Sequence, residues 1–412
     1  MGRVVALLFL CPLSVAAQPL GFEQAIARAL ESNPRTRLAE ADVERARSHV
    51  EQARAGSLPR LDVGVSHVWL QSVALDEKGA RGQLSSTLGI ATARFPLLEP
   101  RAWADWAEAL EDVDVAEAGA LAQRRRVALA AGRAWTAVLF HTHVVETREE
   151  ALRTAEAHLA FAQGRLEQHA STQLELARAQ RERAAVAALV EQARGQLVRA
   201  QESLGVILGA DAAVEIDVHD TRALEAATWA GARPDVEQAA RSAHALHEEV
   251  GHAYTDYLPS VAVVAQGFLQ DAPTPSLPVT GVGWIAQVVV SLPLYDGGRR
   301  EGLQHERRVR EASARLRLEE LDRTAHAEVR SGLEERRRAE TALERAKEAD
   351  AYSHEALRLT QTRFRTGVGT DLDVIDALRE ARDADLAVAL AEDALRVAQL
   401  EVLAASGHLD VP

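Results

Sequence analysis

An internal repeat is the feature that most constrains how this chain can fold. Three landmarks recur at offsets of 200, 197 and 198 residues, which predicts a tandem duplication with two units of about 190 residues. The landmarks are Leu58-Pro59 with Leu258-Pro259, Phe95-Pro96-Leu97 with Leu292-Pro293-Leu294, and Arg165, Thr172 and Leu174 with Arg363, Thr370 and Leu372. We therefore divide the chain into a first unit at 18–208, an insert at 209–233 and a second unit at 234–412.

Each unit has the same expected order of elements: a helix, two strands joined by a loop, a very long helix and a return helix. The first unit has them at 21–55, 59–70, 86–95, 101–169 and 172–208, and the second at 234–257, 259–269, 284–292, 299–364 and 370–405. Either long helix would reach about 100 Å if unbroken, and its thin Ala and Leu seams suit coiled-coil packing. The predicted fold class is mainly α with a small β part.

The strands have the length and pattern of bilayer-crossing strands. Leu61, Val63 and Val65 alternate with polar or small residues, and about ten residues suffice for an oblique crossing. Trp69 and Trp284 lie on strands, where they would form an aromatic belt at a lipid interface or simply be buried at the base of the strands. Prolines bound the strands and are expected to act as strand–helix hinges: Pro59, Pro96, Pro259 and Pro293.

The N-terminus has the pattern of a signal peptide. Arg3 precedes an apolar run at 4–15, and a small-residue cleavage site ends at Ala17, so we expect residues 1–17 to be removed. The alternative is a lipoprotein signal ending at Cys11, although Leu10 is large for the position before a lipidated cysteine. No cysteine follows, so the exported chain would fold without disulfides.

Charge and hydropathy exclude some partners. A net charge of −14 argues against nucleic-acid binding, which needs a basic face.

No later stretch is apolar over 18 residues, so we predict no membrane-spanning helix, and an exported protein of the outer membrane would then span it with strands. Four strands cannot close a barrel alone, because the smallest barrels have about eight and open edges are unstable in lipid. Two copies would supply eight strands and three would supply twelve, enough to enclose water.

The sequence resembles the TolC-type outer-membrane efflux proteins over essentially the whole mature chain. The resemblance is carried by the opening at 20–34, by the segment 293–298 (Pro-Leu-Tyr-Asp-Gly-Gly) and by the segment 364–376 (Phe-Arg-Thr-Gly-Val-Gly-Thr-Asp-Leu-Asp-Val-Ile-Asp). It implies a homotrimer with a shared twelve-stranded barrel in outer-membrane lipid, continued by a helical barrel in the periplasm. It also implies a passive exit duct that docks to a periplasmic adaptor and an inner-membrane pump. The rival interpretations are a soluble periplasmic coiled-coil scaffold and a secreted enzyme.

Acidic residues at the start of the last helix are candidates for a pore constriction. Asp373 and Asp376 lie one turn apart, and the first unit keeps one acid, Glu175, at the matching positions. One explanation is that they complement the positive end of the helix. The resemblance implies instead that three copies form acidic rings that narrow the periplasmic mouth and favour cations. The tyrosine and arginine that lock this mouth in the family are replaced by Phe364 and Gly369.

The short turns before the return helices are expected to form the helical tips where an adaptor docks. These turns contain glycine or polar residues, which stop and restart helices. The tip residues are His169, Ser171, Thr172, Gly367, Gly369 and Thr370.

Catalytic and cofactor motifs are lacking in the sequence. His244, His247 and His252 lie on one expected helix, but spacings of three and five do not place all three on one face, so we expect no metal site there. His141 and His143 point in different directions from a helix. The sequence has no metalloprotease, serine-hydrolase or phosphate-loop motif, so we expect neither catalysis nor a bound cofactor.

Overall fold

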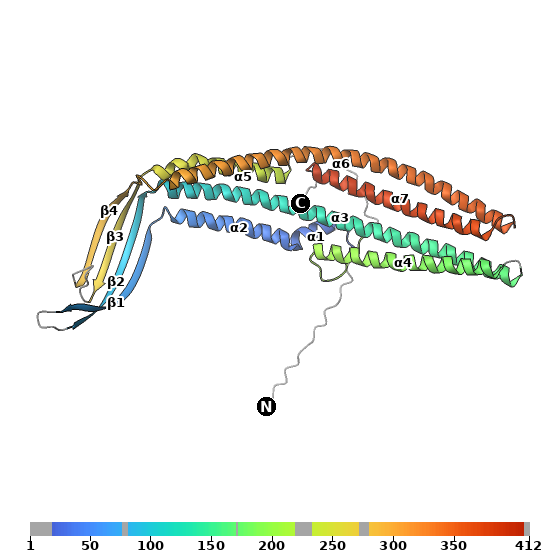
Figure 1. Cartoon of the computed structure of the whole chain (residues 1–412), viewed down its shortest axis with the longest axis horizontal. Helices are drawn as coiled ribbons and strands as arrows, with labels where there is room; N and C mark the ends of the chain where they lie inside the picture. Colours follow the sequence, from blue (N-terminus) through green and yellow to red (C-terminus); the bar gives the residue numbers. More distant parts are fainter. Residues whose placement is uncertain (1–18, 76–80, 170–171, 219–232, 272–279, 408–412) are drawn as a thin grey trace, which may run out of the picture. The chain divides into compact units, whose positions relative to one another are not determined.

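Long helices and one small antiparallel sheet make up the computed structural model, which describes residues 19–75, 81–169, 172–218, 233–271 and 280–407 (Figure 1). In chain order the elements are α1 (Phe22–Ser32), α2 (Pro34–Ala55), β1 (Arg60–Leu75), β2 (Arg81–Leu98), α3 (Pro100–Glu167), α4 (Gln173–Ile207), α5 (Pro234–Gly251), the 3₁₀-helix η2 (His252–Tyr257), β3 (Ser260–Gln270), β4 (Gly281–Ser291), α6 (Arg299–Arg365) and α7 (Asp371–Ala405). The expected order of helix, strand pair, long helix and return helix therefore occurs twice. None of these helices contains an apolar stretch long enough to cross a bilayer.

The chain divides into two compact units, and each takes segments from both predicted repeats. The sheet unit comprises Ala39–Ala120 and Asp235–Asp322, and the core unit comprises Met1–Leu38, Leu121–Pro234 and Arg323–Pro412, of which only the described residues are discussed. The repeat boundaries at 208 and 233 are divisions of the sequence and stay predictions. The expected signal peptide, Cys11 and most of the expected insert lie outside the described residues.

The sheet unit contains all four strands in the order β1-β2-β3-β4, every pair antiparallel. Pro59 and Pro259 lie directly before β1 and β3, and Pro293 lies two residues after β4 ends. Pro96 differs from its predicted position at the end of a strand, because it lies within β2 and is paired with Ala262. The register shifts immediately after it, a bulge that accommodates a residue without an N–H, and helix α3 begins at Pro100 instead.

Two helices expected to be continuous are interrupted. The helix predicted at 21–55 breaks at Asn33, whose extended backbone (φ −68°, ψ 128°) is the conformation that a following proline favours. The Asn33 side chain donates to the carbonyl oxygen of Ile207 at 2.8 Å, which fixes the break against α4. The helix predicted at 234–257 ends at Gly251 and continues as the 3₁₀-helix η2.

An apolar cluster in the core unit joins α1, α3, α4 and α7. Trp135 on α3 is fully buried, and Phe22 packs edge-on against it with ring centroids 5.4 Å apart. The Trp135 indole nitrogen donates to the carbonyl oxygen of Leu20 at 3.1 Å, so the polar end of this large side chain is also satisfied. In a chain with only 4% aromatic residues, this indole is the largest side chain in the described core.

A buried ion cluster joins the two return helices of the core unit. Glu182 on α4, with 5% of its side chain exposed, accepts hydrogen bonds from Arg379 at 2.6 Å and from Arg382 at 3.3 Å, both on α7. The hydrogen bond to Glu182 raises the pKa of the Arg379 guanidinium. One carboxylate therefore holds two guanidinium groups across the α4–α7 contact.

Trp135→Ala should destabilise the protein strongly. Removing a fully buried indole leaves a cavity in the apolar core, so we expect a loss of about 3–5 kcal/mol in the free energy of unfolding, measured by thermal or denaturant unfolding. Trp103, with 45% of its surface exposed, is the matched control, and Trp103→Ala should cost far less. Equal losses in the two variants would contradict the assignment of Trp135 as the core anchor.

Glu182→Ala should also destabilise the protein, because it removes the buried carboxylate that Arg379 and Arg382 share. Because the two arginines are partly exposed, we expect about 2–3 kcal/mol, below the full cost of breaking a buried ion pair. The control is Glu156→Ala, which removes an exposed ion pair with Arg183 and should cost about 0–1 kcal/mol. Denaturant unfolding of both variants measures the difference, and a Glu182 loss no larger than the Glu156 loss would refute the role of the cluster.

Candidate functional site

The two faces of the sheet differ in polarity. The register places Val63, Ala91, Gly267 and Trp284 in one row on one face. The same alternation along each strand gives this apolar face the following large side chains: Leu61, Val63, Val65, Trp69, Phe95, Val261, Val263, Leu269, Val282, Trp284, Val288 and Val290. The opposite face, here the polar face, is mixed and carries these charged and amide side chains: Asp62, Arg94, Gln266, Gln270 and Gln287.

The apolar face is exposed to solvent in the single chain. Val63, Val282 and Trp284 have 75%, 84% and 80% of their surfaces exposed. Contact of this much apolar surface with water is unfavourable in an assembled protein. The sheet also has open edges, because β1 and β4 each pair on one side only among the described strands. A surface of this kind can contact lipid with one face and water with the other, and can extend by pairing with further strands.

The two candidate belt tryptophans lie on the apolar face but in different rows. Trp284 aligns with Val63, whereas Trp69 lies six residues further along β1 and pairs with Ser85. Six residues correspond to about 20 Å along a strand. Their shared face fits contact with lipid, and the aromatic belt stays a prediction.

The α6–α7 tip is a helix end closed by glycine. Gly367 has φ +80°, and its N–H donates to the carbonyl oxygen of Phe364 at 3.1 Å, while the N–H of Val368 donates to that of Arg363 at 3.0 Å. This pair of bonds is the Schellman motif. Gly369 follows at a close approach, since a side chain there would lie 3.1 Å from the Phe364 nitrogen.

The α3–α4 tip uses a histidine where the other tip uses glycine. His169 lies 198 residues before Gly367, has φ +55°, and donates its N–H to the carbonyl oxygen of Leu166 at 3.0 Å. Histidine tolerates this left-handed conformation at some energetic cost. The predicted tip residue Ser171 lies outside the described residues.

Both return helices restart in the same way. Thr370 caps α7 by accepting from the N–H of Asp373 at 3.2 Å, and Asp373 accepts from the N–H of Thr370 at 2.9 Å, which completes a capping box. In the first half of the chain, Thr172 accepts from the N–H of Glu175 at 3.3 Å. Both return helices therefore start with a threonine cap, and α7 has in addition the reciprocal bond to Asp373.

The capping explanation holds for Asp373 in the single chain. The hydrogen bond from the Thr370 backbone lowers the pKa of Asp373, so this carboxyl stays ionised. Asp376 is half exposed and lies 3.6 Å from Arg379, which partly offsets its charge. Capping uses one Asp373 oxygen and leaves the negative charge at the helix start, so it does not conflict with a role at a pore mouth.

Phe364 is buried in the α6–α7 tip. Its ring centroid lies 5.7 Å from that of Phe161, and the Arg165 guanidinium lies 4.7 Å from it. The sequence did not indicate the adjacent pair His158 and Asp371, whose Nε2 and Oδ1 atoms are 2.9 Å apart with both side chains over nine-tenths buried. These residues lie 213 positions apart, so no local pattern could have paired them.

The histidines singled out in the sequence do not meet. His244, His247 and His252 face three different carboxylates, those of Glu111, Glu311 and Glu108, at 4.0, 2.8 and 3.9 Å. Each of the three histidines thus has a different acidic neighbour in the sheet unit.

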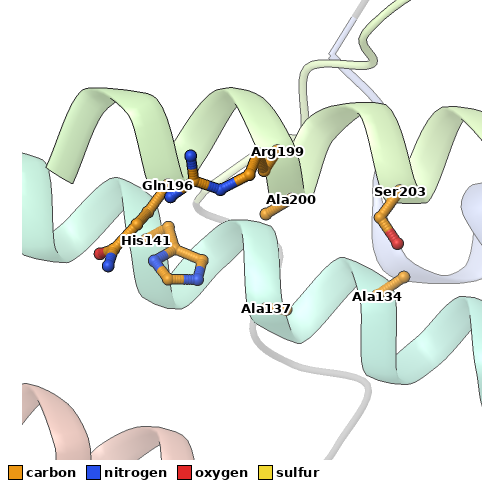
Figure 2. A pocket seen from close by; sticks show the side chains of 7 residues that line it. All are labelled: Ala134, Ala137, His141, Gln196, Arg199, Ala200 and Ser203. Atoms are coloured by element: carbon orange, nitrogen blue, oxygen red, sulfur yellow. The ribbon is translucent and has the colours of Figure 1, made fainter. Parts of the chain in front are cut away.

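His141 lines a cavity of about 430 Å³ between α3 and α4 (Figure 2). Its lining is Ala134, Ala137, His141, Gln196, Arg199, Ala200 and Ser203. Burial, and then the charge of Arg199, lower the pKa of His141, so its imidazole is neutral at physiological pH. His143 lines a different cavity, as its opposite direction on the helix predicted.

Comparisons with known proteins agree with this architecture. The family model described as "Outer membrane efflux protein" matches residues 25–210 and 229–408. The chain is 24% identical to the toluene efflux pump outer membrane protein TtgC of Pseudomonas putida, over 89% of this chain and 78% of that one. It is 25% identical to the outer membrane protein OprJ of Pseudomonas aeruginosa, over 86% of this chain and 77% of that one.

Solved structures show the same fold. CusC superposes with a TM-score of 0.82 at 18% identity, covering 94% of this chain and 92% of CusC. The CmeC outer membrane channel of Campylobacter jejuni superposes with a TM-score of 0.77 at 15% identity, over 94% of this chain and 85% of that one. With the sheet faces and the capped tips, the match of the family model over both halves of the chain leads to one assignment: this protein belongs to the outer membrane efflux protein family.

Proposed function

We propose that this chain is the outer-membrane exit duct of a tripartite efflux or type I secretion system and acts as a homotrimer. The observation that carries the proposal is the sheet, which has one apolar face and two open edges. Pairing β4 of one copy with β1 of the next would satisfy both edges, and three copies would give a twelve-stranded barrel with a polar lumen. The duct would be passive, with no energy source and no catalysis of its own.

The proposed partners follow from the relatives of this chain and from its helical tips. The relative TtgC is named as the outer membrane protein of an efflux pump, which supports an inner-membrane pump as a partner of this chain. The helical tips around Gly367, Gly369, Thr370, His169, Ser171 and Thr172 would contact a periplasmic adaptor. Their caps support this role, because a threonine caps the return helix at both tips. An exposed apolar sheet face does not fit a soluble scaffold, because contact of such a face with water is unfavourable.

The acidic residues would narrow the periplasmic mouth. Three copies of Asp373 and Asp376 would concentrate negative charge around the axis, and Glu175 would add a further acid from the first half of each chain. In the single chain the hydrogen bond from the Thr370 backbone lowers the pKa of Asp373, which favours the ionised form that this role needs.

Matched arginine substitutions on the two sheet faces test the barrel. Val288 lies on the apolar face and Gln287, its neighbour in the chain, on the polar face. A charge on a lipid-facing position costs about 2–4 kcal/mol at the bilayer midplane and less toward the interfaces, so we expect Val288→Arg to reduce the trimer recovered from outer membranes, whereas Gln287→Arg should be tolerated. The measurement is the yield and detergent mass of the complex; a monomeric mass for the wild type, or equal yields for the two variants, would refute the shared barrel.

The mouth is tested by the double variant Asp373→Asn with Asp376→Asn in planar-bilayer recordings. Asparagine retains an oxygen that can accept from Thr370, so the cap should persist while the charge is lost. We expect channels with reduced cation selectivity and reduced block by multivalent cations. The control is Asp383→Asn with Glu355→Gln, which removes equal charge further from the tip and should leave both properties unchanged. If the mouth variant conducts like the wild type, the two acids only cap the helix; if the wild type forms no channels, the duct itself is refuted.

A further inference from the structure

Three side chains with metal-binding atoms meet between α6 and α7 in the core unit. Asp350 and His354 lie one turn apart on α6, and Asp385 lies on α7. One ligand atom from each residue lies within 4.8 Å of the other two. A single atom, Nε2 of His354, lies 2.8 Å from Oδ1 of Asp385 and 3.6 Å from Oδ1 of Asp350.

These separations suit a small divalent ion. Nitrogen and oxygen ligands bind Zn²⁺ at about 2.0–2.2 Å, so two ligands of a tetrahedral site lie about 3.4 Å apart. The two measured separations from the imidazole nitrogen lie on either side of that value. Residues four apart on a helix share a face, so Asp350 and His354 can chelate one ion without moving the backbone.

The charges of the group are incompletely balanced without a metal ion. Oδ1 of Asp350 is inaccessible to solvent and has no hydrogen-bond partner. The group brings two carboxyl groups to one imidazole. A divalent cation would balance the charge of both carboxylates and would give the buried oxygen a partner.

Space for the remaining ligands lies beside the three residues. A cavity of about 260 Å³ borders Asp350 and Asp385 and is also lined by His143, Glu146 and Thr147 of α3. This volume holds several water molecules. It therefore offers an ion both water and further nitrogen or oxygen donors.

We propose that Asp350, His354 and Asp385 bind one divalent transition-metal ion, which cross-links α6 to α7. An imidazole nitrogen beside two carboxylates favours ions of the zinc type over Mg²⁺ and Ca²⁺, which prefer oxygen ligands alone. The site lies within one chain and goes beyond the duct function, so either proposal can fail without the other.

The test is metal binding by the purified full-length protein in detergent, stripped with a chelator. Zn²⁺ is titrated against a chromophoric competitor, and Co²⁺ is added separately because its absorption spectrum reports nitrogen and oxygen ligands. We expect one ion per chain in the wild type. Asp385→Asn and Asp350→Asn keep the side-chain shape and should each weaken binding at least about tenfold, and His354→Ala should abolish it. His244→Ala, which removes an exposed histidine in the sheet unit, is the control and should bind like the wild type.

Three results would overturn the proposal: no stoichiometric Zn²⁺ binding by the wild type, unchanged binding in Asp385→Asn and Asp350→Asn, or equal binding of Mg²⁺ or Ca²⁺. The two asparagine variants keep the test decisive if His354→Ala folds poorly. With no binding, or with binding unchanged in the asparagine variants, the three side chains would only link α6 to α7 by hydrogen bonding. Equal binding of Mg²⁺ or Ca²⁺ would show a site without the proposed selectivity.

Discussion

The structure depends on a sheet that cannot be complete within one chain. Its strands pair in the order β1-β2-β3-β4, so two edges present free backbone groups, and its apolar face has no cover from the described residues. In lipid an unpaired edge is unstable, because no water is present to satisfy its N–H and C=O groups. This constraint is the physical argument for the proposed assembly with further copies of the chain.

The helical part is stabilised within the single chain by a small number of buried groups. Its apolar core is small and rich in alanine, so a few buried groups carry much of the specificity: the Trp135 indole, the Glu182 carboxylate with its two arginines, and the Asp371–His158 pair. Arg379 contacts both Glu182 and Asp376. The same guanidinium therefore links the packing of the return helices to the charge at the start of α7. Removing either carboxylate changes the electrostatic environment of the other through Arg379.

Local features could be read from the sequence, and long-range pairs could not. The strands, the turns and the long helices follow from alternation, glycine placement and the repeat. Alternation does not reveal that β2 continues through Pro96, because a bulge depends on the partner strand. The helix break at Asn33 has a local signal, the Asn33-Pro34 pair, which the predicted helix at 21–55 does not take into account. The Glu182 cluster, the Asp371–His158 pair and the third member of the Asp350–His354–Asp385 group join residues that lie 31 to 213 positions apart. Sequence spacing contains no signal for such contacts.

At both tips the residue in the left-handed conformation donates its N–H to the carbonyl three residues back, yet this residue is Gly367 at one tip and His169 at the other. The two matched joints therefore differ in side-chain chemistry, because only one of them carries this imidazole. A ring of three chains would display six tips of two alternating kinds, so its end would have threefold and not sixfold chemical symmetry. A protein that binds this end would contact two kinds of tip. Six identical subunits of such a protein would occupy two inequivalent kinds of binding site.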